Sequence, residues 1–208
     1  MNKIIKLLMI SDIFVITGFG LMEPILAIFI KENLIGGTIF AAGLASTLFL
    51  ITKCSVQLPF SKYIDTHSRK VRWLILGTFL VSIVPFIYIF SKQIMYIYFA
   101  QVLYGLGAGL AYPTWLGLWS THLDRKHESF EWSLYSTLTG LGVAGTAVVG
   151  ATIAEFFGFE YTFTLTGVMS LIGCIILFKL ERKNHHYDLI NMAHFHKHRK
   201  MIHKKHSR

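Results

Sequence analysis

Six apolar stretches, each long enough to cross a lipid bilayer, are the feature that most limits what this chain can fold into. A transmembrane helix needs about 20 mostly apolar residues. Hydrocarbon offers no partner to exposed backbone N–H and C=O groups, so such stretches form helices rather than open sheets. We therefore predict an all-α fold, an integral membrane bundle of six transmembrane helices over residues 8–30, 38–60, 72–91, 93–121, 131–154 and 160–180.

Composition agrees with a membrane protein. Hydrophobic residues make up 53% of the chain and charged residues 15%, against about 25% charged residues in soluble domains. Cys54 and Cys174 lie in apolar runs without the spacing of a disulfide framework or metal site, so we expect both to be packing residues. Asp12 interrupts what could otherwise be a signal peptide, which favours an uncleaved first span.

The distribution of lysine and arginine predicts the orientation. All of them except Lys31, Lys53 and Lys92 fall in segments 1–7, 61–72, 122–130 and 179–208, which lie on one side of a six-span bundle. By the positive-inside rule this side is cytoplasmic, as are both termini. The same bias accounts for the net charge of +9 without a nucleic-acid partner. We expect a multi-pass protein of the inner (plasma) membrane of a bacterial cell.

Small residues recur at helical spacing inside the spans. The segment "GLGAGLAYP" at 105–113 is glycine-rich, but it lies within a span with no strand before it, so it does not predict a phosphate-binding loop. Its better interpretation is close helix packing, because a GxxxG face lets two backbones approach. The faces expected to pack in this way carry Gly105 and Gly109, Gly142, Thr146 and Gly150, and Ala41 and Ala45.

Three ionisable side chains fall inside the spans: Asp12, Glu23 and Lys53. Each costs about 2.5–3.5 kcal/mol at mid-helix, so such residues usually face a bundle interior or a water-filled cavity. Asp12 and Lys53 lie at similar depths on antiparallel helices, which predicts an intramembrane ion pair.

Glu23 has no basic residue at its depth on a neighbouring span. A carboxyl group without a basic partner in apolar surroundings favours its neutral form, which suits a group that couples transport to protons or contacts a solute. Pro24 can kink the helix beside it. The alternative is a protonated Glu23 that donates a hydrogen bond to a backbone carbonyl.

The connection after the second span carries a family resemblance. The sequence "QLPFSKYIDTHSRKVR" at 57–72 resembles the signature loop G-x-x-x-D-[RK]-x-G-[RK]-[RK] of the major facilitator superfamily, with Asp65, Arg69 and Lys70 in matching positions. Serine replaces both glycines. The resemblance implies that this loop helps to set the balance between inward- and outward-open states.

Two further segments resemble the same family and depart from it at one residue each. "QVLYGLGAGLAYP" resembles the fourth-span pattern with Gln101 in place of its arginine. "GTAVVGATIAEFFGFEYTF" resembles the fifth-span segment with Ala147 in place of the proline found in antiporters. These departures argue against a typical drug–proton antiporter.

Family members have twelve spans in two six-helix halves related by an axis along the membrane normal. The chain supplies one half, so a parallel homodimer is expected to complete the architecture, with a second half-transporter or a truncated gene product as alternatives. The resemblance further implies that the central cavity is lined by spans that carry Glu23, Gln101, Tyr104 and Tyr135.

Residues 181–208 form a basic, histidine-rich cytoplasmic tail, distinct from the bundle at 1–180. Juxtamembrane basic residues attract anionic lipid, at about 1 kcal/mol each, and this is the favoured interpretation. Weak binding of a divalent metal by His194, His196 and His198 is the alternative.

No nucleophile–base pair, metal cage or cofactor loop is found in the sequence, so we expect neither an enzyme nor a cofactor. The leading hypothesis is a half-size secondary transporter that moves a small solute by alternating access. The second is a membrane protein of the same fold that does not transport but acts as a scaffold or interacts with lipid.

Overall fold

The computed structural model describes residues 1–67, 70–124 and 126–181, and all six predicted spans are helices within it. Each helix is long and apolar enough to cross a membrane, and no β-strand occurs among the described residues, which confirms the predicted all-α bundle. The helices are α1 (Lys3–Asn33), α2 (Ile39–Asp65), α3 (Lys70–Ile89), α4 (Ile94–His122), α5 (Glu128–Phe157) and a sixth helix (Phe159–Glu181).

Local side-chain chemistry fixes several helix ends. Asn2 and Thr38 precede α1 and α2, and their side chains accept hydrogen bonds from the backbone N–H groups of Ile4 and Ala41 at 3.1 and 3.0 Å. Such caps satisfy donors that the first turn leaves without a partner. Gly158 ends α5 with a φ of 102°, a left-handed conformation that glycine adopts without strain, so the chain turns directly into the sixth helix.

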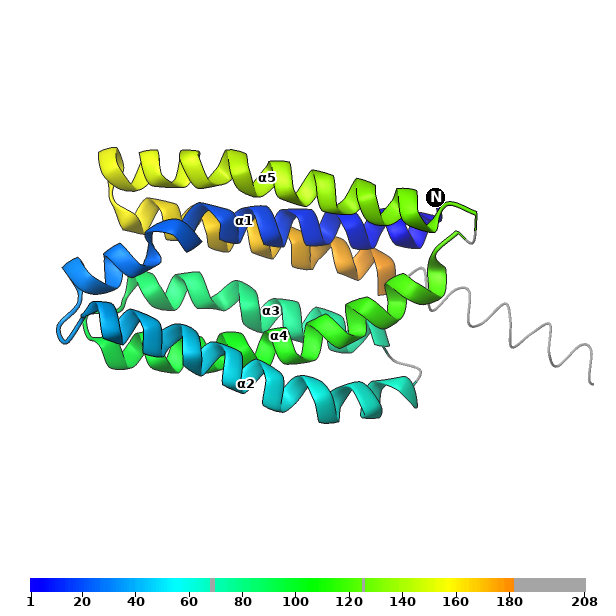
Figure 1. The fold of residues 1–208 in the computed structure, drawn as a ribbon, viewed down its shortest axis with the longest axis horizontal. Coiled ribbons are helices and arrows are strands. Elements are labelled where there is room, and N and C mark those ends of the chain that lie inside the picture. The colour runs from blue at the N-terminus through cyan, green and yellow to red at the C-terminus, as the bar shows by residue number, and fades with distance from the viewer. Residues whose placement is uncertain (68–69, 125, 182–208) are drawn as a thin grey trace, which may run out of the picture.

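The six helices form two groups of three (Figure 1). α1 and α5 lie with the sixth helix in the upper part of the view, and α2, α3 and α4 lie in the lower part. The sixth helix also joins the groups, because the Phe86 ring of α3 lies against its Gly167. Arg72 of α3 forms an ion pair with Glu181 at 2.6 Å between Nε and Oε1.

Close backbone contacts occur at the predicted small-residue faces. A Cβ added to Gly105 would lie 2.7 Å from the Phe49 carbonyl oxygen of α2, and one added to Gly150 would lie 2.0 Å from the Leu21 carbonyl oxygen of α1. Gly142 packs equally closely on Thr17. The packing role predicted for these glycines is therefore confirmed, and it explains how α2 reaches α4 and α5 reaches α1.

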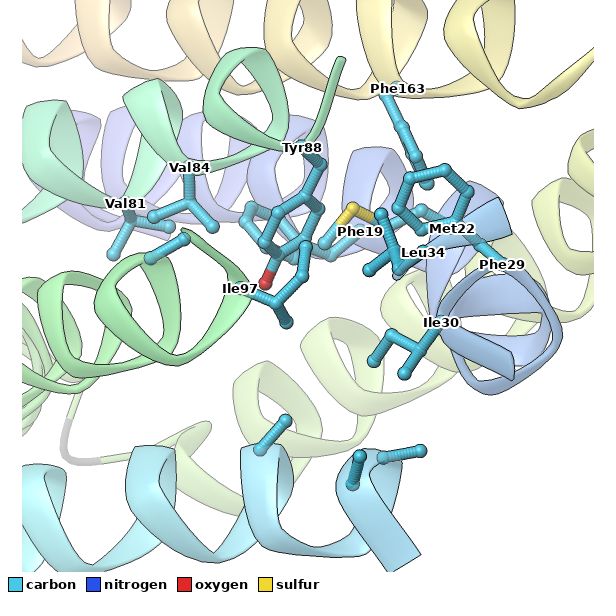
Figure 2. Packing of buried hydrophobic residues seen from close by; sticks show 14 residues of the cluster. Phe19, Met22, Phe29, Ile30, Leu34, Val81, Val84, Tyr88, Ile97 and Phe163 are labelled. Carbon is cyan, nitrogen blue, oxygen red and sulfur yellow. The ribbon is translucent and has the colours of Figure 1, made fainter. Parts of the chain in front are cut away.

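Buried apolar side chains gather in two clusters toward opposite ends of the bundle. One lies toward the α1–α2 connection, where Phe163 contacts Phe29 and Tyr88 at ring-centroid distances of 4.9 and 5.7 Å (Figure 2). The other lies toward the N-terminus and includes Ile5 and Trp119.

Candidate functional site

A cavity of about 230 Å³ lies between the two groups of three helices and receives side chains from all six. Most of its wall is apolar, but Asp12 and Tyr135 enter from α1 and α5, and Lys53 enters from α2. α4 contributes Tyr104, Tyr112 and Trp115. A mostly apolar cavity with a few convergent polar groups is typical of a small-molecule site.

Asp12 does not form the predicted ion pair. Its carboxylate instead accepts a hydrogen bond from the Tyr135 hydroxyl, which links α1 to α5. Among the described residues, the ion pairs are that of Arg72 with Glu181 and that of the N-terminal amine with Glu131, and neither involves Lys53. Asp12 and Lys53 do line the same cavity, but the carboxylate is hydrogen-bonded to Tyr135 and the ammonium group lies over aromatic rings.

Lys53 is held by aromatic rings. Its Nζ lies 4.7 Å from the centre of the Tyr112 ring and 5.9 Å from that of Phe49. Aromatic faces attract an ammonium group, by about 0.5–2 kcal/mol depending on how far it is desolvated. This contact leaves the N–H donors of Lys53 without an oxygen acceptor among the described residues.

Aromatic side chains form much of the remaining wall. Tyr104 stacks on Phe49 at 4.2 Å and on Phe19 at 4.8 Å between ring centroids. Trp115 lies 5.0 Å from the ring of Tyr135, and its buried Nε1 has no hydrogen-bond partner among the described residues. The Trp115 side chain therefore adds to the aromatic wall, while its Nε1 stays buried.

Sequence reasoning missed Phe49, Tyr112 and Trp115. A signal for them exists, because Phe49 precedes Lys53 by one helical turn on α2. On α4, Tyr112 and Trp115 follow Tyr104 at spacings of eight and eleven residues, which places them on the same helix face. Once Tyr104 was selected, the face it belongs to could have been read from the sequence.

The other two predicted cavity residues lie elsewhere. Gln101 is 3% exposed, packed within the bundle near Tyr88, and is not part of the cavity wall. Glu23 has an exposed side chain near Tyr104, on the surface of the bundle rather than in this cavity. Of the four predicted residues, the structure brings together Tyr104 and Tyr135.

The predicted signature-loop residues lie at the junction of α2 and α3. Asp65 is the last residue of α2, with an exposed side chain, and Lys70 is the first residue of α3. Arg69, the tail at 182–208 and its histidines His194, His196 and His198 lie outside the described residues. Within the part of the chain that the structure describes, no group of three potential metal ligands comes together.

α2 and α5 are the least buried of the six helices and expose small residues. A Cβ added to Gly43 of α2, or to Gly140 or Gly145 of α5, would meet nothing within 4 Å. Each of these glycines therefore differs from Gly105 and Gly150, whose neighbours leave no room for a side chain.

Comparison with known proteins gives three findings. The family model described as Major Facilitator Superfamily matches residues 8–201. The maltose permease of Geobacillus stearothermophilus is 27% identical over 178 residues, which make up 81% of this chain and 44% of the permease. The structure of PepTSo, a transporter of the POT family, superposes with a TM-score of 0.76 at 16% identity over 88% of this chain and 38% of that one. The chain thus spans less than half the length of either protein.

Proposed function

Because the chain belongs to the major facilitator superfamily, we propose that it is one half of a secondary transporter, which moves a small solute by alternating access. A second copy in parallel orientation supplies the other half. The observation that carries this proposal is the exposed carboxylate of Glu23 in the middle of a membrane-spanning helix.

Glu23 is a costly residue to expose to hydrocarbon. A carboxylate at mid-span costs about 2.5–3.5 kcal/mol, so its face should be covered by protein or water. The six helices of this chain leave part of it uncovered. A partner bundle packed against this face would place Glu23 in a shared, hydrated passage, where it is available to couple protons or to contact a solute.

The exposed glycines support the same partner. Lipid-facing positions do not require glycine, whereas close helix contacts do. Gly43 on α2 and Gly140 and Gly145 on α5 have open space around them. α2 and α5 lie at opposite edges of the bundle (Figure 1). A two-fold axis along the membrane normal would bring α2 of one copy against α5 of the other. Each copy would then cover the exposed glycine-bearing face of its partner.

A parallel arrangement follows from charge. Lysine and arginine concentrate at the end of the bundle that holds the N-terminus, and an inverted copy would violate the positive-inside rule. The proposed location is the inner membrane of a bacterial cell with both termini cytoplasmic. The permease relative is bacterial.

Cross-linking through Cys54 tests the dimer. Cys54 is exposed on α2 and Cys174 is buried, so Cys174→Ala leaves one accessible thiol. Leu138 on α5 is exposed and lies ten residues from the start of its helix, and Cys54 lies eleven from the end of α2, so their depths agree within about 2 Å. We expect Leu138→Cys in this background to give covalent dimers in membranes.

The matched control is Ile172→Cys on the sixth helix, an exposed residue nine positions from the same end. This residue faces away from the proposed interface and should give no dimer above background. A chain that stays monomeric with both thiols, in membranes and after gentle detergent extraction, would contradict the homodimer. Dimers formed through Ile172→Cys alone would contradict this interface.

Solute flux tests transport itself. Proteoliposomes with an imposed pH gradient should accumulate a labelled solute, and Glu23→Gln should remove the dependence on the gradient. Labelled maltose is one probe, because a relative bears that name, and labelled 4-aminobutyrate, a short zwitterion, is the other. A dimeric protein without flux of either probe would favour the scaffold function over transport.

A further inference from the structure

We propose that the cavity between the helix groups binds a small zwitterion, with the ammonium group of the ligand at Asp12 and its carboxylate at Lys53. This inference rests on the proposed function in that it names the solute class for this half. The binding that it predicts does not itself require a second half.

Opposite charges that face one cavity without pairing carry the inference. Asp12 and Lys53 both line the cavity, yet the carboxylate accepts from Tyr135 and the ammonium lies over Tyr112. Both side chains are half-buried, and a charge partly removed from water is stabilised by an opposite charge beside it. A ligand with one charge of each sign can compensate both groups at once, whereas a singly charged ligand leaves one of them alone.

The present contacts leave room for this ligand. A carboxylate can accept about four hydrogen bonds, so Asp12 can receive an ammonium group while it keeps the hydrogen bond from Tyr135. The three N–H donors of Lys53 can turn toward a carboxylate while its stem stays against the rings.

The shape and wall chemistry limit the ligand further. A volume of about 230 Å³ admits a compound of a few carbon atoms with some water. The stacked rings of Phe49 and Tyr104 offer apolar surface in the same cavity. A short methylene chain or one apolar side chain suits this wall, whereas a polyol leaves most of its hydroxyl groups without partners.

The ligand would also connect the two groups of helices. Asp12 and Tyr135 belong to α1 and α5, whereas Lys53 and Tyr112 belong to α2 and α4. A bound zwitterion therefore tethers one group to the other, and the thermal stability of the bundle should rise with the logarithm of its concentration above the dissociation constant.

Binding to the purified full chain in detergent is the test, measured by isothermal titration and by thermal unfolding. The probes are the ω-amino acids from glycine to 6-aminohexanoate, together with L-leucine, and the controls are butyrate, butylamine and maltose. We expect at least one zwitterion to bind at least tenfold more tightly than every control. The best chain length will report the spacing between the two charged groups.

Variants assign each end of the ligand. Asp12→Asn keeps an oxygen acceptor for Tyr135, and Lys53→Gln keeps a polar group of similar length, so both should fold. Each should weaken zwitterion binding by about tenfold or more, the effect of losing one charged hydrogen bond. Lys53→Arg should restore most of the affinity. Lys92→Gln, an exposed residue in the α3–α4 connection, is the control without effect.

Three results would overturn the inference. They are binding of maltose that neither variant changes, binding of butyrate or butylamine as tight as that of any zwitterion, or no binding of any probe by a folded chain. A zwitterion that binds but is not carried into proteoliposomes would leave the site in place and contradict only the proposed transport.

Discussion

On the side of the bundle formed by α3 and the sixth helix, a Cβ added to Gly167 would meet the Phe86 ring at 2.5 Å, whereas on α2 and α5 a Cβ added to Gly43 or Gly140 meets nothing within 4 Å. The residue type and the membrane setting are the same on both sides. Glycine on the closed side is explained by a neighbour within the chain. We infer that glycine on the open side is explained by a neighbour outside it.

The largest expected effect comes from overfilling a closed contact. Gly150→Val would place side-chain atoms against the Leu21 backbone, where an added Cβ already lies 2.0 Å from the carbonyl oxygen. Since the backbone cannot move as a side chain can, α5 should separate from α1, at a cost of about 3 kcal/mol, near the upper end of the range for overpacking. Thermal unfolding in detergent and gel filtration measure this. A variant as stable as the parent would mean that α1 and α5 are not packed in this way.

The next largest effect is expected from a substitution on the open face, which compares it directly with the closed contact. Gly145→Leu on the open face should leave the stability of the six-helix bundle unchanged or slightly raised, because leucine favours the helix more than glycine does. It should nevertheless lower the yield of the Cys54–Leu138→Cys cross-link several-fold, because Gly145 lies about two turns from Leu138 on the same helix face and the added side chain holds the two copies apart. Unchanged cross-linking would place Gly145 against lipid and remove it from the interface.

Sequence reasoning recovered the parts of this comparison that depend on periodicity. Spans, their order and the packing roles of Gly105 and Gly150 follow from apolar length and from small residues at helical spacing. Helix ends were predicted less accurately, since α1 begins at Lys3 rather than at residue 8. The helix is extended by the capping side chain of Asn2, and a hydropathy profile does not reveal such a cap.

The candidate site was harder to predict because it depends on rotation about the helix axes. Depth along the bundle led us to pair Asp12 with Lys53, and both line one cavity, but depth does not determine which side chains contact each other. Tyr135, which lies on a helix distant in the sequence, donates a hydrogen bond to the Asp12 carboxylate. Gln101 was selected by its position in a family pattern, and the structure buries it in packing. Which side chains contact each other is determined by tertiary packing rather than by local sequence.

A smaller effect tests whether polar contacts add to the packing of α1 on α5. Tyr135→Phe keeps the ring against Trp115 and removes the hydroxyl that donates to Asp12. The loss should cost about 1.5–3 kcal/mol, the usual range for a hydrogen bond to a charged group. Tyr161→Phe is the matched control, since its ring is 65% exposed on the sixth helix. Equal unfolding temperatures for the two variants would show that Asp12 finds another partner at no cost.

The smallest expected effect lies at the end of the closed side. Arg72 and Glu181 join α3 to the sixth helix, but their side chains are 58% and 30% exposed. Ion pairs with this exposure contribute about 0–1 kcal/mol, and salt screens them. A double-mutant cycle with Arg72→Gln and Glu181→Gln, measured by thermal unfolding at low and high salt, should give a coupling within that range that shrinks as salt rises. Coupling above about 2 kcal/mol would exceed what such exposed pairs supply. In that event charge, and not only the contact of Gly167 with Phe86, would hold the closed side together.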